Sequence, residues 1–166
     1  AANVMEMNKD EHAAADADME KMMGAAALDQ VIVIDSITDR VIARIPIGSE
    51  SHLAHVVVTP DSKTAYVTSQ EKGEIYKINA VSYAIENKIT IGVDSGPHGL
   101  RISPDGTKAF IALVNGKALA VLDMRSDMVK KYPVNSGVVQ TAVTPDGKYA
   151  FASLYSTKQI MRFDIA

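Results

Sequence analysis

The sequence predicts an all-β protein, a β-propeller of four-stranded antiparallel blades, with about three blades in this chain and one helix before them. Turns built on Pro-Asp precede an alternating apolar strand three times, at Pro60, Pro104 and Pro145. A polar residue also closes one strand of each unit, at Asp35, Asn79, Asp123 and Asp164. The prolines are 44 and 41 residues apart, and the polar residues 44, 44 and 41. A period in the low forties with four short strands per unit is typical of propeller blades.

The first 30 residues differ from the rest of the chain. They contain seven acidic residues against two lysines, and five of the eight methionines. Ala, Glu, Met and Lys dominate residues 10–28 and all favour a helix, for which Asn8 or Asp10 can serve as the N-cap. We therefore expect an acidic, Met-rich helical segment over residues 1–30, followed by propeller blades over residues 31–166.

From residue 31 the apolar pattern has the alternation of β-strands. Two β-branched runs, 31–35 and 41–47, predict an antiparallel pair joined by a turn. Similar pairs recur at 74–79 with 84–91 and at 118–123 with 128–134, and a last strand spans 159–164. Each Pro-Asp turn joins the two strands that precede such a pair. Counted from the innermost strand of a blade, the chain has two strands, two complete blades of four, and three final strands.

These strands predict an incomplete ring, because closed propellers have at least about four blades. Open blade faces expose apolar surface and unpaired strand edges, which folded chains avoid. Three explanations remain. A second copy or another protein completes the ring, the chain belongs to a longer polypeptide, or the N-terminal helix caps the open end. We expect a protein partner or a second copy to complete the ring.

The repeat resembles the YVTN type of β-propeller repeat over residues 28–166. The resemblance is carried by the strand Tyr66-Val67-Thr68-Ser69, the Pro-Asp-Gly-Lys turns, and Gly96-Pro97-His98-Gly99. It departs at Ser62, where Gly is usual, and in the third copy, which lacks the Gly-Pro. The resemblance implies about seven blades in a finished ring, so that this chain supplies roughly half. It also implies similarity to propellers of periplasmic redox proteins, such as nitrous oxide reductase and cytochrome cd1 nitrite reductase.

Composition excludes several classes of function. A net charge of −3 without a clustered basic face argues against nucleic-acid binding, and no apolar run approaches the length of a transmembrane segment. The absence of cysteine excludes disulfides, thiolate metal sites and covalently attached c-type haem on this chain. The start at Ala1-Ala2-Asn3 suits an exported protein cut after small residues, and equally a fragment. We expect a periplasmic or extracellular location.

Three histidines are candidate metal ligands. His52 and His55 lie in the link into one innermost strand, and His98 occupies the matching link one blade later. Such links cluster near the mouth of the central channel, so the three imidazoles can share one space. Imidazole ligates copper and haem iron, and the redox propellers that this repeat resembles place histidines at that mouth. The alternative is structural: a channel histidine forms a hydrogen bond to a neighbouring backbone carbonyl.

The N-terminal segment is a second candidate metal site. On a helical period His12, Met19 and Met23 fall on one face, and thioethers with an imidazole suit Cu(I). The alternative is that the methionines form an apolar stripe that packs against a blade or a partner. Copper is therefore a possible cofactor of this segment, and copper or haem is the cofactor that His55 and His98 would hold in the redox alternative.

Motifs of catalysis are absent from the sequence. It has no Gly-x-Ser-x-Gly elbow, no phosphate-binding loop and no nucleophile paired with a base. The aspartates of the Pro-Asp turns, at Asp61, Asp105 and Asp146, are predicted to bond their own backbone. We therefore expect an exported, non-catalytic binding module or scaffold within a larger assembly. The alternative is a subunit of a periplasmic redox enzyme or a copper-handling protein, so the sequence leaves open whether the chain belongs to an enzyme.

Overall fold

The computed structural model describes residues 28–165, which form thirteen β-strands in four antiparallel sheets. The first sheet has two strands, β1 (Asp29–Asp35) and β2 (Arg40–Gly48). The second has four, β3 (Leu53–Val58), β4 (Thr64–Ser69), β5 (Glu74–Asn79) and β6 (Ile85–Thr90). The third has β7 (Pro97–Ile102), β8 (Lys108–Leu113), β9 (Ala118–Asp123) and β10 (Val129–Pro133). The fourth has three, β11 (Val138–Val143), β12 (Tyr149–Leu154) and β13 (Gln159–Asp164).

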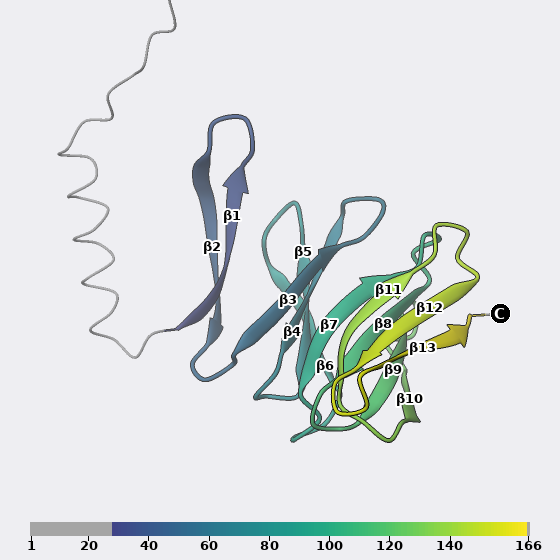
Figure 1. Ribbon diagram of the computed structural model, residues 1–166. Coiled ribbons are helices and arrows are strands. Elements are labelled where there is room, and N and C mark those ends of the chain that lie inside the picture. The colour runs from purple at the N-terminus through teal and green to yellow at the C-terminus, as the bar shows by residue number, and fades with distance from the viewer. Residues whose placement is uncertain (1–27, 166) are drawn as a thin grey trace, which may run out of the picture.

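The predicted all-β architecture of four-stranded antiparallel blades is confirmed, including the division into two, four, four and three strands. β1 begins at Asp29, two residues before the predicted strand. Residues 1–27 lie outside the described range, and the predicted N-terminal helix falls almost entirely within them. The sheets succeed one another like the blades of a fan, from the β1–β2 hairpin to β13 (Figure 1).

The Pro-Asp turns form as predicted. Each aspartate accepts a hydrogen bond of 3.1 Å from the backbone N–H two residues later, at Lys63, Thr107 and Lys148. The residue after each aspartate has a left-handed backbone, with φ of 60° at Ser62, 70° at Gly106 and 69° at Gly147. Ser62 therefore keeps the turn geometry of the two glycines, at the steric cost that a side chain carries in this region.

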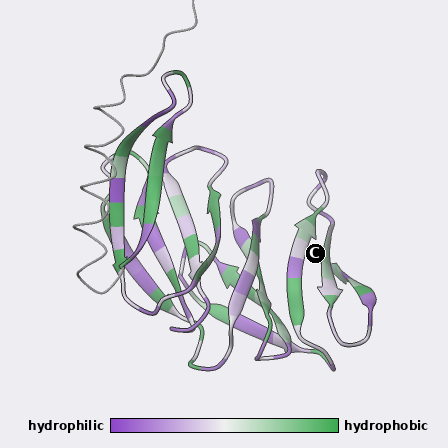
Figure 2. Cartoon of the chain, turned by 60° about the vertical axis from the view of Figure 1, so that its left-hand side comes forward, coloured by the Kyte–Doolittle hydropathy of each residue, from purple (hydrophilic) through white to green (hydrophobic). Residues whose placement is uncertain are grey.

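Apolar side chains fill the spaces between successive sheets. Tyr66 and Ile75 of the second sheet pack against Leu100 and Ile111 of the third. Similar clusters join the third sheet to the fourth, and the β1–β2 hairpin to the second. Apolar and polar stretches both occur along the strands, and the β1–β2 hairpin is mostly apolar between polar ends (Figure 2). Burial between sheets is the main term that holds the blades together.

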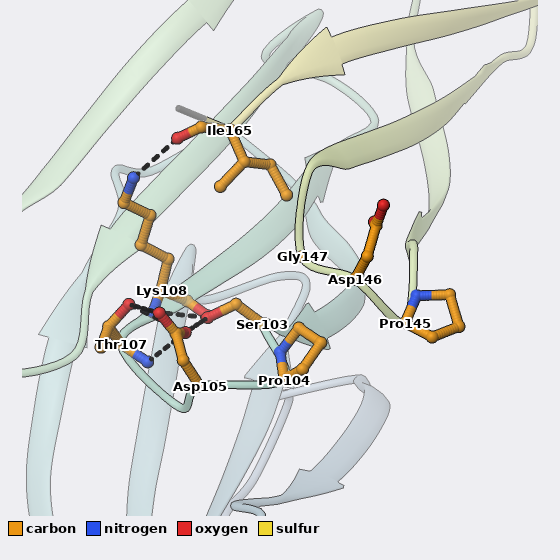
Figure 3. A pocket seen from close by; sticks show the side chains of 9 residues that line it. All are labelled: Ser103, Pro104, Asp105, Thr107, Lys108, Pro145, Asp146, Gly147 and Ile165. Atoms are coloured by element: carbon orange, nitrogen blue, oxygen red, sulfur yellow. Dashed lines mark hydrogen bonds between the residues drawn. The ribbon is translucent and has the colours of Figure 1, made fainter.

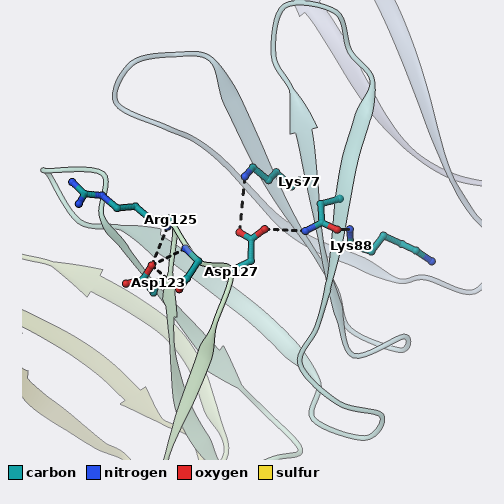
Figure 4. Close-up of polar contacts among 7 residues, drawn as sticks. Lys77, Lys88, Asp123, Arg125 and Asp127 are labelled. Atoms are coloured by element: carbon teal, nitrogen blue, oxygen red, sulfur yellow. Dashed lines mark hydrogen bonds and ion pairs between the residues drawn. The ribbon is translucent and has the colours of Figure 1, made fainter.

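A polar contact adds to this packing near the outer edge of the blades. The Asp127 carboxylate, in the turn between β9 and β10, accepts a hydrogen bond of 2.9 Å from the Asn87 side chain on β6. Its other oxygen lies 3.9 Å from the Lys77 ammonium on β5 (Figure 4). The turn of one blade thus contacts the two outer strands of the preceding blade.

Candidate functional site

The candidate site lies along the first strand of each blade. β3, β7 and β11 lie at one edge of their sheets, and neighbouring blades meet through them, since β7 lies against β3 and β11 lies against β7. Each of these strands has a β-bulge at the same point of the repeat, within 53–55, 97–100 and 138–141. Bulges turn side chains out of the regular alternation, and they are frequent beside functional sites.

Side-chain hydroxyls satisfy the backbone that two of these bulges leave unpaired. Thr68 Oγ1 on β4 accepts a hydrogen bond of 3.0 Å from the His55 N–H. Ser153 Oγ on β12 accepts the equivalent bond, also 3.0 Å, from the Gln140 N–H. In the remaining blade, which contains β7 and β8, the position equivalent to Thr68 and Ser153 is Ala112, and the bulge opposite it contains Gly99. Two blades thus have a hydroxyl on the second strand that bonds the bulge, and the third blade has a glycine in the bulge itself.

His55 is half-buried on β3 and contacts the next blade. Its Nε2 forms a hydrogen bond with the guanidinium of Arg101 on β7, which also donates a 2.7 Å bond to the Leu100 carbonyl. Burial lowers the pKa of His55 below 6.5, and the nearby Arg101 and His98 charges lower it further. A neutral imidazole whose Nε2 accepts from Arg101 fits this geometry.

His98 contacts the blade that follows. Its Nδ1 lies 3.1 Å from the Val139 carbonyl oxygen on β11, which is the structural role that the sequence offered as the alternative to metal ligation. Gly99, the next residue, is required for the same close approach. A Cβ at this position would lie 2.7 Å from the Val139 carbonyl oxygen and 2.8 Å from Gln140 Cα. The backbones of the first strands β7 and β11 therefore approach each other closely at Gly99.

The structure brings together two of the predicted metal ligands. His55 and His98 lie on neighbouring first strands, and the Thr68 hydroxyl forms hydrogen bonds with the N–H of His55 and the carbonyl of His98. His52 lies apart in the exposed link before β3, where its Nδ1 is 3.7 Å from a Glu71 carboxylate oxygen. His12, Met19 and Met23 lie outside the described residues. Within residues 28–165 no group of three or more His, Asp or Glu side chains is arranged to hold a metal ion.

Arg101 is the residue of this site that the sequence analysis missed. The positions equivalent to it in the other two blades are Val57 and Ala142, so a charged residue here breaks the apolar pattern of the repeat. This charged residue at an otherwise apolar repeat position was a sequence signal that could have identified Arg101 as part of the site. The guanidinium beside His55 Nε2 disfavours a cation at that nitrogen, because like charges repel. The site is thus better suited, as it stands, to joining blades than to holding a metal.

A shallow hollow of about 190 Å³ lies between two Pro-Asp turns, away from these histidines. Ser103 and Asp105 line one side and Pro145 and Asp146 the other (Figure 3). Lys108 Nζ donates a 2.9 Å hydrogen bond to the Ile165 carbonyl at its edge. The Asp105 and Asp146 carboxylates accept hydrogen bonds within their own turns, so the hollow is a gap between two adjacent blades.

No known family profile matches the chain. It is 24% identical over 174 residues to hydrazine synthase subunit beta of Kuenenia stuttgartiensis, which covers 76% of this chain and 45% of that protein. Among solved structures it resembles hydrazine synthase of the same organism, with a TM-score of 0.64 at 19% identity over 69% of this chain and 33% of that one. A putative 6-phosphogluconolactonase from Bacteroides fragilis gives 0.68 at 16% identity, covering 84% of this chain and 45% of that one. Virginiamycin B lyase from Staphylococcus aureus gives 0.61 at 15%, covering 82% and 48%.

These proteins are β-propeller-like, and at such low identity the likeness shows the fold. The described residues contain no helix long and apolar enough to span a membrane. The chain spans less than half the length of the relative and of each of these structures. It therefore aligns with only part of each of these β-propeller-like proteins.

Proposed function

We propose that this chain is a non-catalytic β-propeller module that supplies roughly half of a ring and acts as a scaffold or binding unit in a larger assembly. The observation that carries the proposal is the state of the two outer sheets. Within the described residues, β1 pairs with β2 alone and β13 with β12 alone, whereas the equivalent strands β5 and β9 are paired on both sides. The two outer sheets therefore each present an unpaired strand edge, on β1 and on β13, that another chain or segment can extend.

Apolar side chains at both ends support the same proposal. Ile32 and Ile34 on β1 are 45% and 59% exposed, and Ile160 on β13 is 77% exposed. Large apolar residues on adjoining strands mark surfaces that are covered in an assembly. Coverage of less than half of the known propellers is consistent with a partial ring, and the relative named as a subunit supports a role in a multi-chain assembly.

Two finer parts of the proposal rest on the sequence. The repeat is of the YVTN type, for which the three Pro-Asp turns and the Tyr66-Val67-Thr68-Ser69 strand are the support. The location is periplasmic or extracellular. Cell fractionation with markers for each compartment tests the location, and recovery of the protein with the cytoplasmic marker would contradict it.

The mass and chain composition of the native particle test the proposed function. The particle is purified from the source cells under non-denaturing conditions and its components are identified by mass spectrometry. We expect a particle substantially heavier than 17.8 kDa, the mass of this chain. A stable monomer of that mass with a single cooperative unfolding transition would contradict the proposal.

A second candidate function is copper or haem binding by His55 and His98, as in a redox assembly. It is favoured by the placement of the two imidazoles on neighbouring first strands, and opposed by the Arg101 contact. Metal analysis and an absorption spectrum of the native particle separate the two functions. Bound copper or haem that is lost in His55→Gln and His98→Gln variants would support metal binding, and a colourless, metal-free particle would exclude it.

A further inference from the structure

We propose that the flank formed by β1 and β3 binds a two-stranded β-hairpin from propeller sequence other than residues 1–166, and that a second copy of this chain does not complete the ring. This inference rests on the proposed function, because it specifies what occupies one open end. It follows from the repeat position of β1, from the exposure of two valines on β3, and from a count of the available hairpins.

β1 occupies the place of a third strand. Its last residue, Asp35, is equivalent to Asn79 at the end of β5 and Asp123 at the end of β9. β5 and β9 each pair with a second strand on their inner side, β4 and β8. β1 and β2 are thus the third and fourth strands of a blade whose first and second strands are missing from the described residues.

The exposure of β3 locates the missing pair. Val56, Leu100 and Thr141 occupy the same position in the first strands of successive blades. Leu100 is fully buried and Thr141 is 4% exposed, because each lies against the preceding blade. Val56 is 52% exposed, and so is Val58 two residues later, although the β1–β2 hairpin packs on the outer part of the same sheet. The uncovered surface is the part that a first and a second strand would cover.

The chemistry of the occupant follows from this surface. One of its strands pairs antiparallel with the free edge of β1, so its backbone groups supply the hydrogen bonds that β1 lacks on that side. Its side chains toward β3 are apolar, because they cover Val56 and Val58 in the way that β3 and β4 cover Leu100. The bound hairpin continues a type of interface that the chain already contains twice, between its second and third and its third and fourth sheets.

A second copy has no such hairpin to offer. Its residues 1–27 have the composition of a helix and contain no Pro-Asp turn, and the hairpins of its described residues are already paired. Each of its first–second strand hairpins, β3–β4, β7–β8 and β11–β12, already pairs with a third strand of its own, β5, β9 or β13. Two copies placed end to end would bring together the three strands of the last sheet and the two of the first. That makes five strands for a four-stranded blade, so the ends of identical chains do not match.

The test uses the lack of cysteine in this chain, which makes a single introduced thiol a unique label. Val56→Cys is produced in the source cells, and Val81→Cys is the matched control, since Val81 is 76% exposed in the turn between β5 and β6. Thiol modification is timed in the native particle. We expect Val56→Cys to react at least roughly tenfold more slowly than the control, because the hairpin must open first. A benzophenone maleimide on the same thiol then crosslinks the occupant, whose peptide is sequenced by mass spectrometry.

The outcomes separate the inference from the proposed function. A crosslink to a peptide absent from residues 1–166 supports the hairpin. A crosslink to a peptide from within residues 1–166, or equal labelling of both thiols in a particle heavier than one chain, overturns the inference and leaves the assembly role standing. A native particle of one 17.8 kDa chain overturns both. Val56→Asp provides a second measurement, because a buried charge releases the hairpin and lowers the particle mass, whereas Val81→Asp leaves the mass unchanged.

Discussion

Thr68 Oγ1 donates a hydrogen bond of 2.9 Å to the carbonyl oxygen of His98, and so joins the second strand of one blade to the first strand of the next. The same oxygen accepts from the His55 N–H inside its own blade. One buried hydroxyl therefore closes a bulge and holds two blades together.

Replacement of Thr68 by Val keeps the shape of this side chain and removes both hydrogen bonds. The His55 N–H and the His98 carbonyl lose a partner in a place with little access to water. We expect a loss of about 1–3 kcal/mol in the free energy of unfolding, measured by denaturant titration. Thr68→Ser retains the hydroxyl and should lose clearly less. Equal losses for the two variants would show that the methyl group is what matters.

Leu100 and Val56 allow the blade interface to be compared with the open flank at one repeat position. Leu100→Ala empties a fully buried site and should cost about 2–5 kcal/mol in the purified chain. Val56→Ala should change the stability of the purified chain by only about 0.5 kcal/mol, because half of the side chain is exposed there. A large loss in Val56→Ala would mean that the flank is already covered in the isolated chain.

Gly99→Ala tests the close approach of β7 and β11. Since the added Cβ would meet the backbone of Val139 and Gln140, neither of which can move without disturbing β11, we expect a cost of about 1–3 kcal/mol. Gln140→Ala in the same chain removes only the contact with the side-chain Oε1, at 2.5 Å, and should restore stability in part. Full restoration would place the clash in that side chain alone.

The Asp105 turn gives the stability of the chain an acid dependence. The Ser103 hydroxyl and then the Thr107 N–H lower the pKa of Asp105 to about 2, from 3.8. Because the folded pKa is the lower one, the stabilisation is complete above pH 3.8 and is lost as the pH falls toward 2. Ser103→Ala should raise the pKa of Asp105 and reduce the acid dependence of unfolding between these values. An unchanged profile would assign the acid sensitivity to other carboxylates.

The His55 imidazole should titrate below 6.5 in metal-free protein, because burial and the charge of Arg101 both favour its neutral form. Its contribution to stability is therefore complete above pH 6.5 and declines as the pH falls through that value toward the folded pKa. Arg101→Gln should raise the pKa of His55 toward 6.5 without reaching it, since burial is the larger cause. Histidine C–H signals followed by NMR across the pH range check this, and an unchanged pKa in Arg101→Gln would contradict the contact.

The repeat made most of the fold predictable. Pro60, Pro104 and Pro145 set a period from which the number of strands and their division among sheets follow, because turn chemistry and alternation are local properties of the sequence. The aspartate side-chain bonds in these turns were predictable for the same reason. The backbone of Ser62 also kept the turn despite the missing glycine.

The candidate site was predictable only in part. The repeat placed His55 and His98 on neighbouring blades, but their contacts depend on how first strands approach one another, which no local pattern encodes. The Arg101–His55 contact joins two neighbouring blades. His52 has a left-handed backbone with φ of 48°, and its side chain lies near Glu71 instead of near the other histidines. Whether His12, Met19 and Met23 bind copper stays a prediction from the sequence.

The proposed function depends on an open arc of blades that is completed by other strands. Electron microscopy of the native particle, with class averages viewed down the propeller axis, tests this most directly. We predict a closed ring that contains more blades than the four sheets of this chain. A particle that shows only an open arc of these four sheets, with no further density against β1 or β13, would contradict it.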